Sequence, residues 1–203
     1  MKKIIIEKYP KILEYLAVAY MGVALIKLNV IDKGYKKHVI LGTLFFSLIS
    51  IRAKKWKIKT TFFNFERFWE ALAWYLLATV VGVFVLYGYS LYYQKEWGAS
   101  ESTLLQYSLG IVVVQEILFR VFLWKLGQEI FGEKAVANII LNTLAFASMH
   151  LVYDGFWQNY LWLLMLLAGA MFATLYYFYP KLYFVVLVHI VLNAVAVHFG
   201  IFH

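Results

Sequence analysis

The chain has 203 residues, of which 64% are hydrophobic, 20% aromatic and only 15% charged, and its formal net charge is +8. Soluble domains are roughly 45–50% apolar and about 25% charged, so this composition excludes an ordinary soluble domain and predicts an integral membrane protein. The chain contains no cysteine, which excludes disulfides, thiolate metal sites and a cysteine nucleophile.

Apolar runs follow one another along the chain, and each predicts a membrane helix. Strands are excluded because an open sheet edge in lipid leaves backbone groups without hydrogen-bond partners. A spanning helix needs roughly 17–25 apolar residues, and the second run falls short of that length. We expect an all-α, polytopic transmembrane bundle with about seven spans, in a range of about six to eight, at the runs Ile12–Ile26, Val39–Ile51, Phe68–Tyr92, Leu104–Trp124, Ala135–Val152, Trp157–Tyr177 and Leu182–Ile201.

The runs leave almost no sequence for a separate soluble part, so residues 1–203 are predicted to form one membrane domain. The first run follows Met1-Lys2-Lys3, contains Glu14 and lacks a small-residue cleavage site. It is expected to be a retained span and not a removable signal peptide.

Basic residues gather before the first and third runs, at Lys2, Lys3, Lys8 and Lys11 and at Arg52, Lys54, Lys55, Lys57 and Lys59. Such clusters favour the cytoplasmic side, and two crossings between them place both there. Lys33, Lys36 and Lys37 then lie outside, against the same rule. The clusters are interpreted as topology signals beside lipid head groups, and no nucleic-acid partner is expected.

The fourth run carries Gln115, Glu116 and Arg120. Glu116 and Arg120 are four residues apart, so they share a helical face in the favourable order for an ion pair. Gln115 is rotated by about 100° from Glu116 and presents its amide to a different side. Ionisable groups at membrane depth are functional-site candidates, although an ion pair that merely neutralises two buried charges is an alternative.

Two further pairs of polar or aromatic residues show the same one-turn spacing. Phe146 and His150 end the fifth run, and His189 and Asn193 lie inside the seventh. His189 and Asn193 should point into the bundle and find partners among the other polar residues, because lipid provides none. A lone histidine near a membrane boundary, such as His150, is also compatible with a simple interfacial role.

In order, Gln115-Glu116-xxx-Arg120, Phe146-xxx-His150 and His189-xxx-Asn193 resemble the three-motif signature of the CPBP family. This family comprises the CAAX prenyl proteases and the bacteriocin-processing or Abi proteins. The signature covers roughly Val112 to Asn193, and the family-like core is expected at about residues 104–201.

The resemblance implies an intramembrane endopeptidase of the glutamic type, in which a carboxylate and a histidine activate water. Carried across, His150 assists the base, His189 and Asn193 form the oxyanion hole, and Arg120 anchors the acidic motif. A base must accept a proton, and fixed donors must meet the charge on oxygen.

This sequence departs from the family pattern at Gln115, where the first of two consecutive glutamates is expected. An amide cannot take the proton of water. Four explanations stay open: the catalytic role has moved to Glu116, His150 acts as base alone, the chain is not a protease, or the residue was altered on purpose to trap a substrate.

One carboxylate and two histidines could also make a hydrolytic zinc site. We rank zinc below a metal-free site, because Glu116 is better held by Arg120 and no His-Glu-xx-His occurs. No cofactor is expected.

The sequence predicts a protease of this family that acts on membrane-embedded peptides or lipidated protein termini. The alternative is a non-proteolytic member that modifies lipoproteins, for example by N-acylation, or binds a membrane client. The expected partners are the bilayer and such a substrate, and the expected location is a bacterial or archaeal cytoplasmic membrane. A transporter would also place polar groups at depth, but no inverted repeat or broken helix pair is found.

Overall fold

The computed structural model describes residues 10–11, 13–14, 17, 65–98, 111–132, 134–152, 156–157 and 159–201. Every regular element within these ranges is a helix, which confirms the predicted all-α class. The first two apolar runs and the start of the fourth lie almost wholly outside the described residues. The predicted number of spans therefore stays a prediction.

Three apolar helices form the upright part of the molecule, α4 (Phe68–Tyr92), α9 (Leu161–Phe178) and α10 (Leu182–His198). Of the described helices, α4 and α9 are long and apolar enough to cross a membrane, whereas α10 is apolar but shorter. Large apolar side chains on the outer face of α4, such as Phe84, are exposed. These exposed side chains are consistent with contact with lipid, because the exposure of so much apolar surface to water costs free energy.

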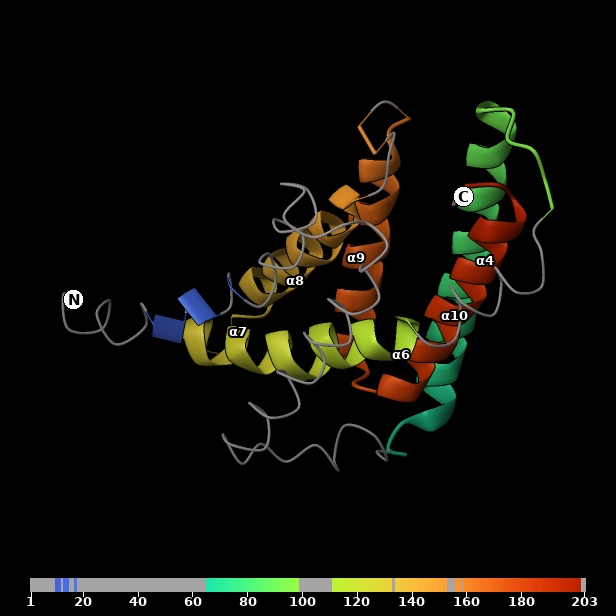
Figure 1. Ribbon diagram of the computed structural model, residues 1–203. Coiled ribbons are helices and arrows are strands. Elements are labelled where there is room, and N and C mark those ends of the chain that lie inside the picture. The colour runs from blue at the N-terminus through green and yellow to red at the C-terminus, as the bar shows by residue number, and fades with distance from the viewer. Residues whose placement is uncertain are drawn as a thin grey trace.

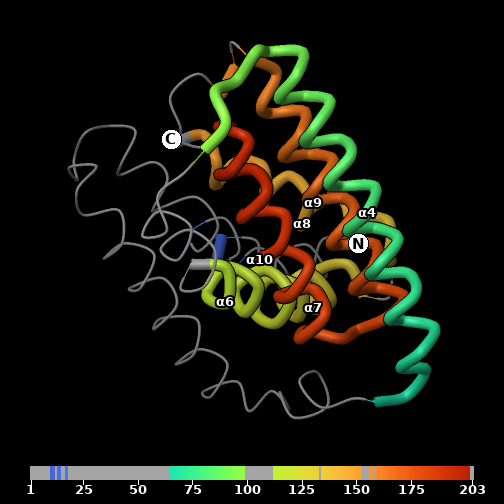
Figure 2. Tube along the Cα trace, turned by 90° about the vertical axis from the view of Figure 1, so that its right-hand side faces the viewer, coloured from blue at the N-terminus to red at the C-terminus, as the bar shows by residue number. Residues whose placement is uncertain are grey.

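Helices α4 and α10 lie side by side and run in the same direction (Figures 1 and 2). At one end the Tyr75 hydroxyl donates to the Tyr179 carbonyl at 2.9 Å, and at the other the Ser90 hydroxyl donates to the Phe199 carbonyl at 2.9 Å. A short turn joins α9 to α10, so α9 runs in the opposite direction. These directions agree with the alternation expected of the third, sixth and seventh apolar runs.

A polar cluster holds the first turn of α4 against the turn between α9 and α10. The Arg67 Nε donates to Glu70 at 2.7 Å, the Tyr179 hydroxyl donates to the same carboxylate at 2.6 Å, and the Lys181 ammonium donates to the Glu66 carbonyl. The Glu70 carboxylate raises the pKa of the Tyr179 phenol above its usual range.

From Ile111 onward the fourth run forms one continuous helix, made up of α6 (Ile111–Glu116), η3 (Ile117–Leu123) and α7 (Trp124–Phe131). It crosses the upright helices (Figure 1). The sequence predicted that this helix ends at Trp124. That prediction is wrong, because the helix continues for seven more residues to Phe131. Helix α7 is amphipathic: it buries Leu126 and Ile130 and exposes Lys125, so the helix outlasts the purely apolar stretch.

Helix α8 (Ala135–Met149) continues into the 3-10 turn η4 (His150–Val152), as the fifth run predicted. It packs closely on α9, because a Cβ on Gly169 would lie 3.1 Å from the carbonyl oxygen of Thr143. Small residues such as Gly169 allow membrane helices to approach each other this closely. Helix α9 begins at Leu161 and not at Trp157, since Tyr160 has the left-handed φ of 52° and cannot continue a helix.

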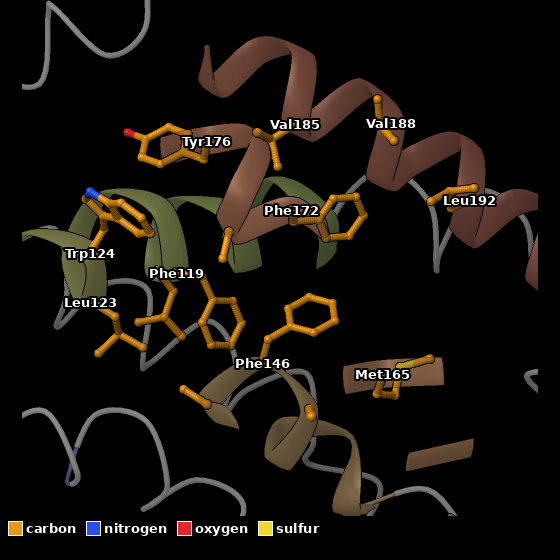
Figure 3. Packing of buried hydrophobic residues seen from close by; sticks show 14 of the residues in the cluster. Phe119, Leu123, Trp124, Phe146, Met165, Phe172, Tyr176, Val185, Val188 and Leu192 are labelled. Atoms are coloured by element: carbon orange, nitrogen blue, oxygen red, sulfur yellow. The ribbon is translucent and has the colours of Figure 1, made fainter. Parts of the chain in front are cut away.

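Aromatic rings fill the region where the crossing helix meets α8 and α9. Phe119 of η3, Phe146 of α8 and Phe172 of α9 point toward one another (Figure 3). The ring centroids of Phe119 and Phe146 are 5.4 Å apart, and those of Phe146 and Phe172 are 5.8 Å apart, both edge to face. Such pairs add stabilisation beyond their buried area. The core therefore lies directly beside the signature residues.

Helices α7 and α8 lie very close together at Gly127. A Cβ there would lie 2.1 Å from Asn138 Oδ1, and Asn138 cannot yield easily because its amide donates to the Trp124 carbonyl. We expect Gly127→Ala to destabilise the protein by about 1–3 kcal/mol through overpacking, measured as thermal unfolding in detergent. Gly88→Ala on α4 is the control, since its Cβ meets nothing within 4 Å. An unchanged unfolding temperature for Gly127→Ala would contradict the close approach.

Candidate active site

Glu116 is completely buried at the point where α6 passes into the π-helical segment η3. Arg120, one turn later and equally buried, donates from Nε to Glu116 Oε2 at 2.9 Å. The predicted ion pair on one helical face is confirmed. π-helical turns are rare and frequently occur at functional sites, and this one carries the arginine of the motif.

The Arg120 guanidinium is surrounded by aromatic rings. Its Cζ lies 6.0 Å from the ring centroids of Phe119, Phe146 and Phe172. Within the part of the chain that the structure describes, Nη1 and Nη2 find no hydrogen-bond acceptor. Buried N–H groups without an acceptor cost free energy, and the aromatic rings offset part of that cost because aromatic faces attract a cation. The arginine is thus held in place, and its ionic partner among the described residues is Glu116.

The second oxygen of Glu116 contacts the seventh apolar run. His189 Nδ1 lies 2.6 Å from Glu116 Oε1, and His189 is only 2% exposed. Rings of Phe146 and Phe172 pack against the imidazole at centroid distances of 5.5 and 5.0 Å. Arg120, Glu116 and His189 therefore form a buried chain of polar contacts that joins two segments about seventy residues apart.

His150 is buried at the end of α8, where its Nδ1 lies 2.9 Å from the Phe146 carbonyl oxygen. A carbonyl can only accept a hydrogen bond, so this Nδ1 donates. The same bond orients the ring, and the Phe146 ring packs against it in a tilted arrangement with the ring centroids 4.9 Å apart. Proton transfer at His150 is therefore left to Nε2.

A cavity of about 290 Å³ lies beside these histidines, between α4, α8, α9 and α10. The polar groups that line it are His150, His189 and Asn193, and the rest of the lining is apolar. His150 and His189 are at most 6% exposed, whereas the lining residues Val81 and Leu167 are 50% and 53% exposed. The cavity is therefore open at an apolar mouth on α4 and α9 and polar at its inner end.

The structure brings together five of the six predicted site residues in this region. Glu116, Arg120 and His189 are joined by direct contacts, and His150 and Asn193 share the cavity lining with His189. Gln115 is buried, and like Glu116 it does not line the cavity, so the prediction that its amide faces a different side from Glu116 stays a prediction.

Sequence reasoning did not identify the contribution of α4 or of Phe172. Val81, Gly82 and Val85 line the cavity, and a Cβ on Gly82 would lie 2.7 Å from a methyl group of Leu192. Helix α4 is apolar on all sides, so no periodic pattern marks its cavity face. No signal in the sequence marks Phe172 either.

Both oxygens of the Glu116 carboxylate are engaged by protein groups, Arg120 and His189. Among the described residues, no group of three or more His, Asp or Glu side chains is placed to hold a metal ion. A metal on Glu116 would have to displace one of the two existing partners.

Comparison with known proteins gives one family. Residues 97–195 match the family model described as Type II CAAX prenyl endopeptidase Rce1-like, which confirms the CAAX prenyl protease family predicted from the three motifs. The matched segment contains every predicted site residue, from Gln115 to Asn193. No curated protein and no solved structure was found to match the chain.

The Arg120–Glu116 pair yields a prediction for stability. Removing one partner of a fully buried pair leaves an uncompensated charge, so Arg120→Met and Glu116→Gln should each destabilise the protein by about 3–5 kcal/mol. The double variant should lose much less than the sum of both. Chemical unfolding in detergent measures this coupling.

The exposed pair Arg67 and Glu70 is the matched control, with the arginine and the acid three residues apart at the start of α4. Exposed pairs contribute little, so Arg67→Met should lose far less stability than Arg120→Met. Strictly additive losses at Arg120 and Glu116 would contradict the buried pair.

Proposed function

Residues 97–195 form a domain of the CAAX prenyl endopeptidase family, and on that premise we propose that this chain is an intramembrane peptidase. Its substrates are peptide bonds close to an apolar chain, in a lipidated protein terminus or a membrane-embedded peptide. The observation that carries the proposal is the cavity with an apolar mouth and three polar groups at its inner end.

The apolar part of the cavity suits a hydrocarbon chain. Its lining from α4 and α9 includes Val81, Val85, Leu167 and Met171 and contains no charged side chain. Burial of each CH₂ in such a cavity contributes about 0.8 kcal/mol. Val81, Val85 and Leu167 are also exposed on the lipid-facing surface, so a chain could enter from the bilayer without crossing water.

The polar end of the cavity suits hydrolysis. His150 and His189 present imidazoles, and Asn193 presents an amide whose N–H groups can donate to a carbonyl oxygen as it becomes negative. A peptide bond attached to a chain in the apolar part would lie beside these groups. Holding the bond there lowers the entropic part of the barrier.

The proposed setting is a multi-pass protein of a bacterial or archaeal cytoplasmic membrane, with the bilayer and a membrane-bound substrate as its partners. The two candidate spans α4 and α9 support a membrane location. The site needs no cofactor in this proposal, because water and two imidazoles suffice for general acid–base hydrolysis.

Gln115 favours a second candidate, a family member that binds or modifies a lipidated client without cleaving it. The family pattern expects a glutamate at this position, and an amide cannot act as base. Under this candidate the cavity holds the acyl or prenyl chain, and hydrolysis is absent from the natural chain.

We expect the purified full chain in liposomes to cleave a peptide whose C-terminal segment carries a farnesylated cysteine, faster than the same peptide without the farnesyl chain. Asn193→Ala should lower the rate by about 10²–10³, the usual cost of one oxyanion donor. His198→Ala, an exposed histidine at the end of α10, is the matched control and should cleave at the normal rate. Mass spectrometry of the products measures each rate.

Two other outcomes decide between the candidates. Cleavage by Gln115→Glu but not by the natural chain would support the non-proteolytic candidate. Binding of the farnesylated peptide with no cleavage by either protein would contradict the peptidase proposal.

The cavity gives a separate prediction on substrate binding. Ala168→Trp on α9 should fill part of the cavity and raise KM for the farnesylated peptide by tenfold or more, because it excludes the apolar chain. Leu187→Trp adds an indole at an exposed position of α10 that does not line the cavity, and it should leave KM unchanged. Equal KM values for the two variants would show that the chain binds elsewhere.

A further inference from the structure

We propose that His189 is the general base of this chain, with Glu116 and Arg120 as the residues that position it; the inference rests on the proposed hydrolysis. It assigns His189 a role different from the oxyanion donor that the family resemblance implies. It also explains how water can be activated although the first position of the acidic motif is Gln115.

The contact between Glu116 and His189 decides where the imidazole proton lies. Glu116 accepts from Arg120 at 2.9 Å, so it is ionised and can only accept hydrogen bonds. His189 Nδ1, 2.6 Å from the other oxygen, must therefore donate its proton. The neutral ring then has an unprotonated Nε2, which is the form that accepts a proton from water.

The charges around the site favour this neutral form before reaction. Arg120 already neutralises Glu116, and the cavity lining from α4 and α9 is uncharged. A proton added to His189 would give Glu116, Arg120 and His189 together a net charge of +1 in an apolar surrounding, which is costly. An oxyanion donor at Nε2 would need that extra proton from the start, whereas a base acquires it only during the reaction.

Of the two imidazoles in the cavity, His189 is the better supported base. Its Nδ1 donates to a carboxylate, while the Nδ1 of His150 donates to the neutral carbonyl of Phe146. Hydrogen bonds to an ionised acceptor are roughly twice as strong as neutral ones, so the Glu116 carboxylate stabilises the protonated ring of His189 more. Gln115 does not line the cavity.

The step balances with the groups at the inner end of the cavity. The oxygen of a water molecule attacks the peptide carbonyl carbon while its proton passes to His189 Nε2, and Asn193 donates to the resulting oxyanion. The C–N bond then breaks, and the proton on Nε2 passes to the leaving amine. The products are a carboxylic acid and an amine, which exchange a proton to become a carboxylate terminus and an ammonium terminus, and His189 returns to its neutral form.

The first test reads the tautomer of His189 in the full-length protein, by nitrogen NMR of ¹⁵N-histidine-labelled chain in lipid nanodiscs. The chain has five histidines, so the signal of His189 is assigned by substituting the other four in turn. We expect a protonated Nδ1 and an unprotonated Nε2 at neutral pH. A proton on Nε2, in either the other neutral tautomer or the imidazolium, would overturn the inference.

The second test is chemical rescue. His189→Gly should lower the cleavage rate by about 10²–10⁴, the usual value of a general base, and added imidazole should restore part of it. If His189 is the base, rescue follows the concentration of neutral imidazole and increases with the basicity of substituted imidazoles. Rescue by the imidazolium form, or rescue that falls with basicity, would identify a hydrogen-bond donor and overturn the inference.

The positioning role of Glu116 is tested in the same assay. Glu116→Gln should lower the rate and shift the NMR signals of His189 toward the tautomer protonated on Nε2, because a side-chain amide can donate to Nδ1. A rate loss with an unchanged tautomer would reduce Glu116 to a structural residue. Absence of cleavage by the natural chain contradicts the proposed function alone, since the NMR measurement does not depend on activity.

Discussion

A carboxylate that is completely buried among apolar helices needs partners that compensate its charge, and Glu116 has two. Arg120 supplies the opposite charge from the next turn, and His189 supplies a hydrogen bond from α10. The rest of the site follows from this requirement. The crossing helix must lie against α10 for the contact to form, and the rings of Phe119, Phe146 and Phe172 must enclose the arginine.

This arrangement separates the charges from the cavity in which a substrate would lie. Glu116 and Arg120 do not line the cavity, and among the residues that the structure describes its polar lining consists of His150, His189 and Asn193. An apolar chain can therefore occupy the cavity without burying an ion. In the proposed mechanism the carboxylate acts on the reacting atoms through the imidazole, in the way that a buried acid orients a histidine in other hydrolases.

The neighbouring positions 115 and 116 differ in their connection to the cavity. Gln115 does not line the cavity, whereas Glu116 contacts His189, which does. Of the two residues, Glu116 is thus the one connected to the cavity. The π-helical segment begins directly after Glu116. The sequence pattern predicts a regular α-helix here and gives no sign of this π-helical turn.

Composition and spacing were sufficient for the all-α class, for the bounds of α4 and α8, and for the ion pair of Glu116 and Arg120, because these depend on hydrophobicity and on residues within one helical turn. The three motifs were also sufficient for the family. Tertiary structure alone decided that Glu116 contacts His189, that Phe172 covers Arg120, and that α4 closes the cavity through Val81 and Gly82. These contacts join segments far apart in the chain, so local sequence patterns cannot predict them. A helix that is apolar on every side also has no sequence pattern to show which face contacts another helix and which face contacts lipid.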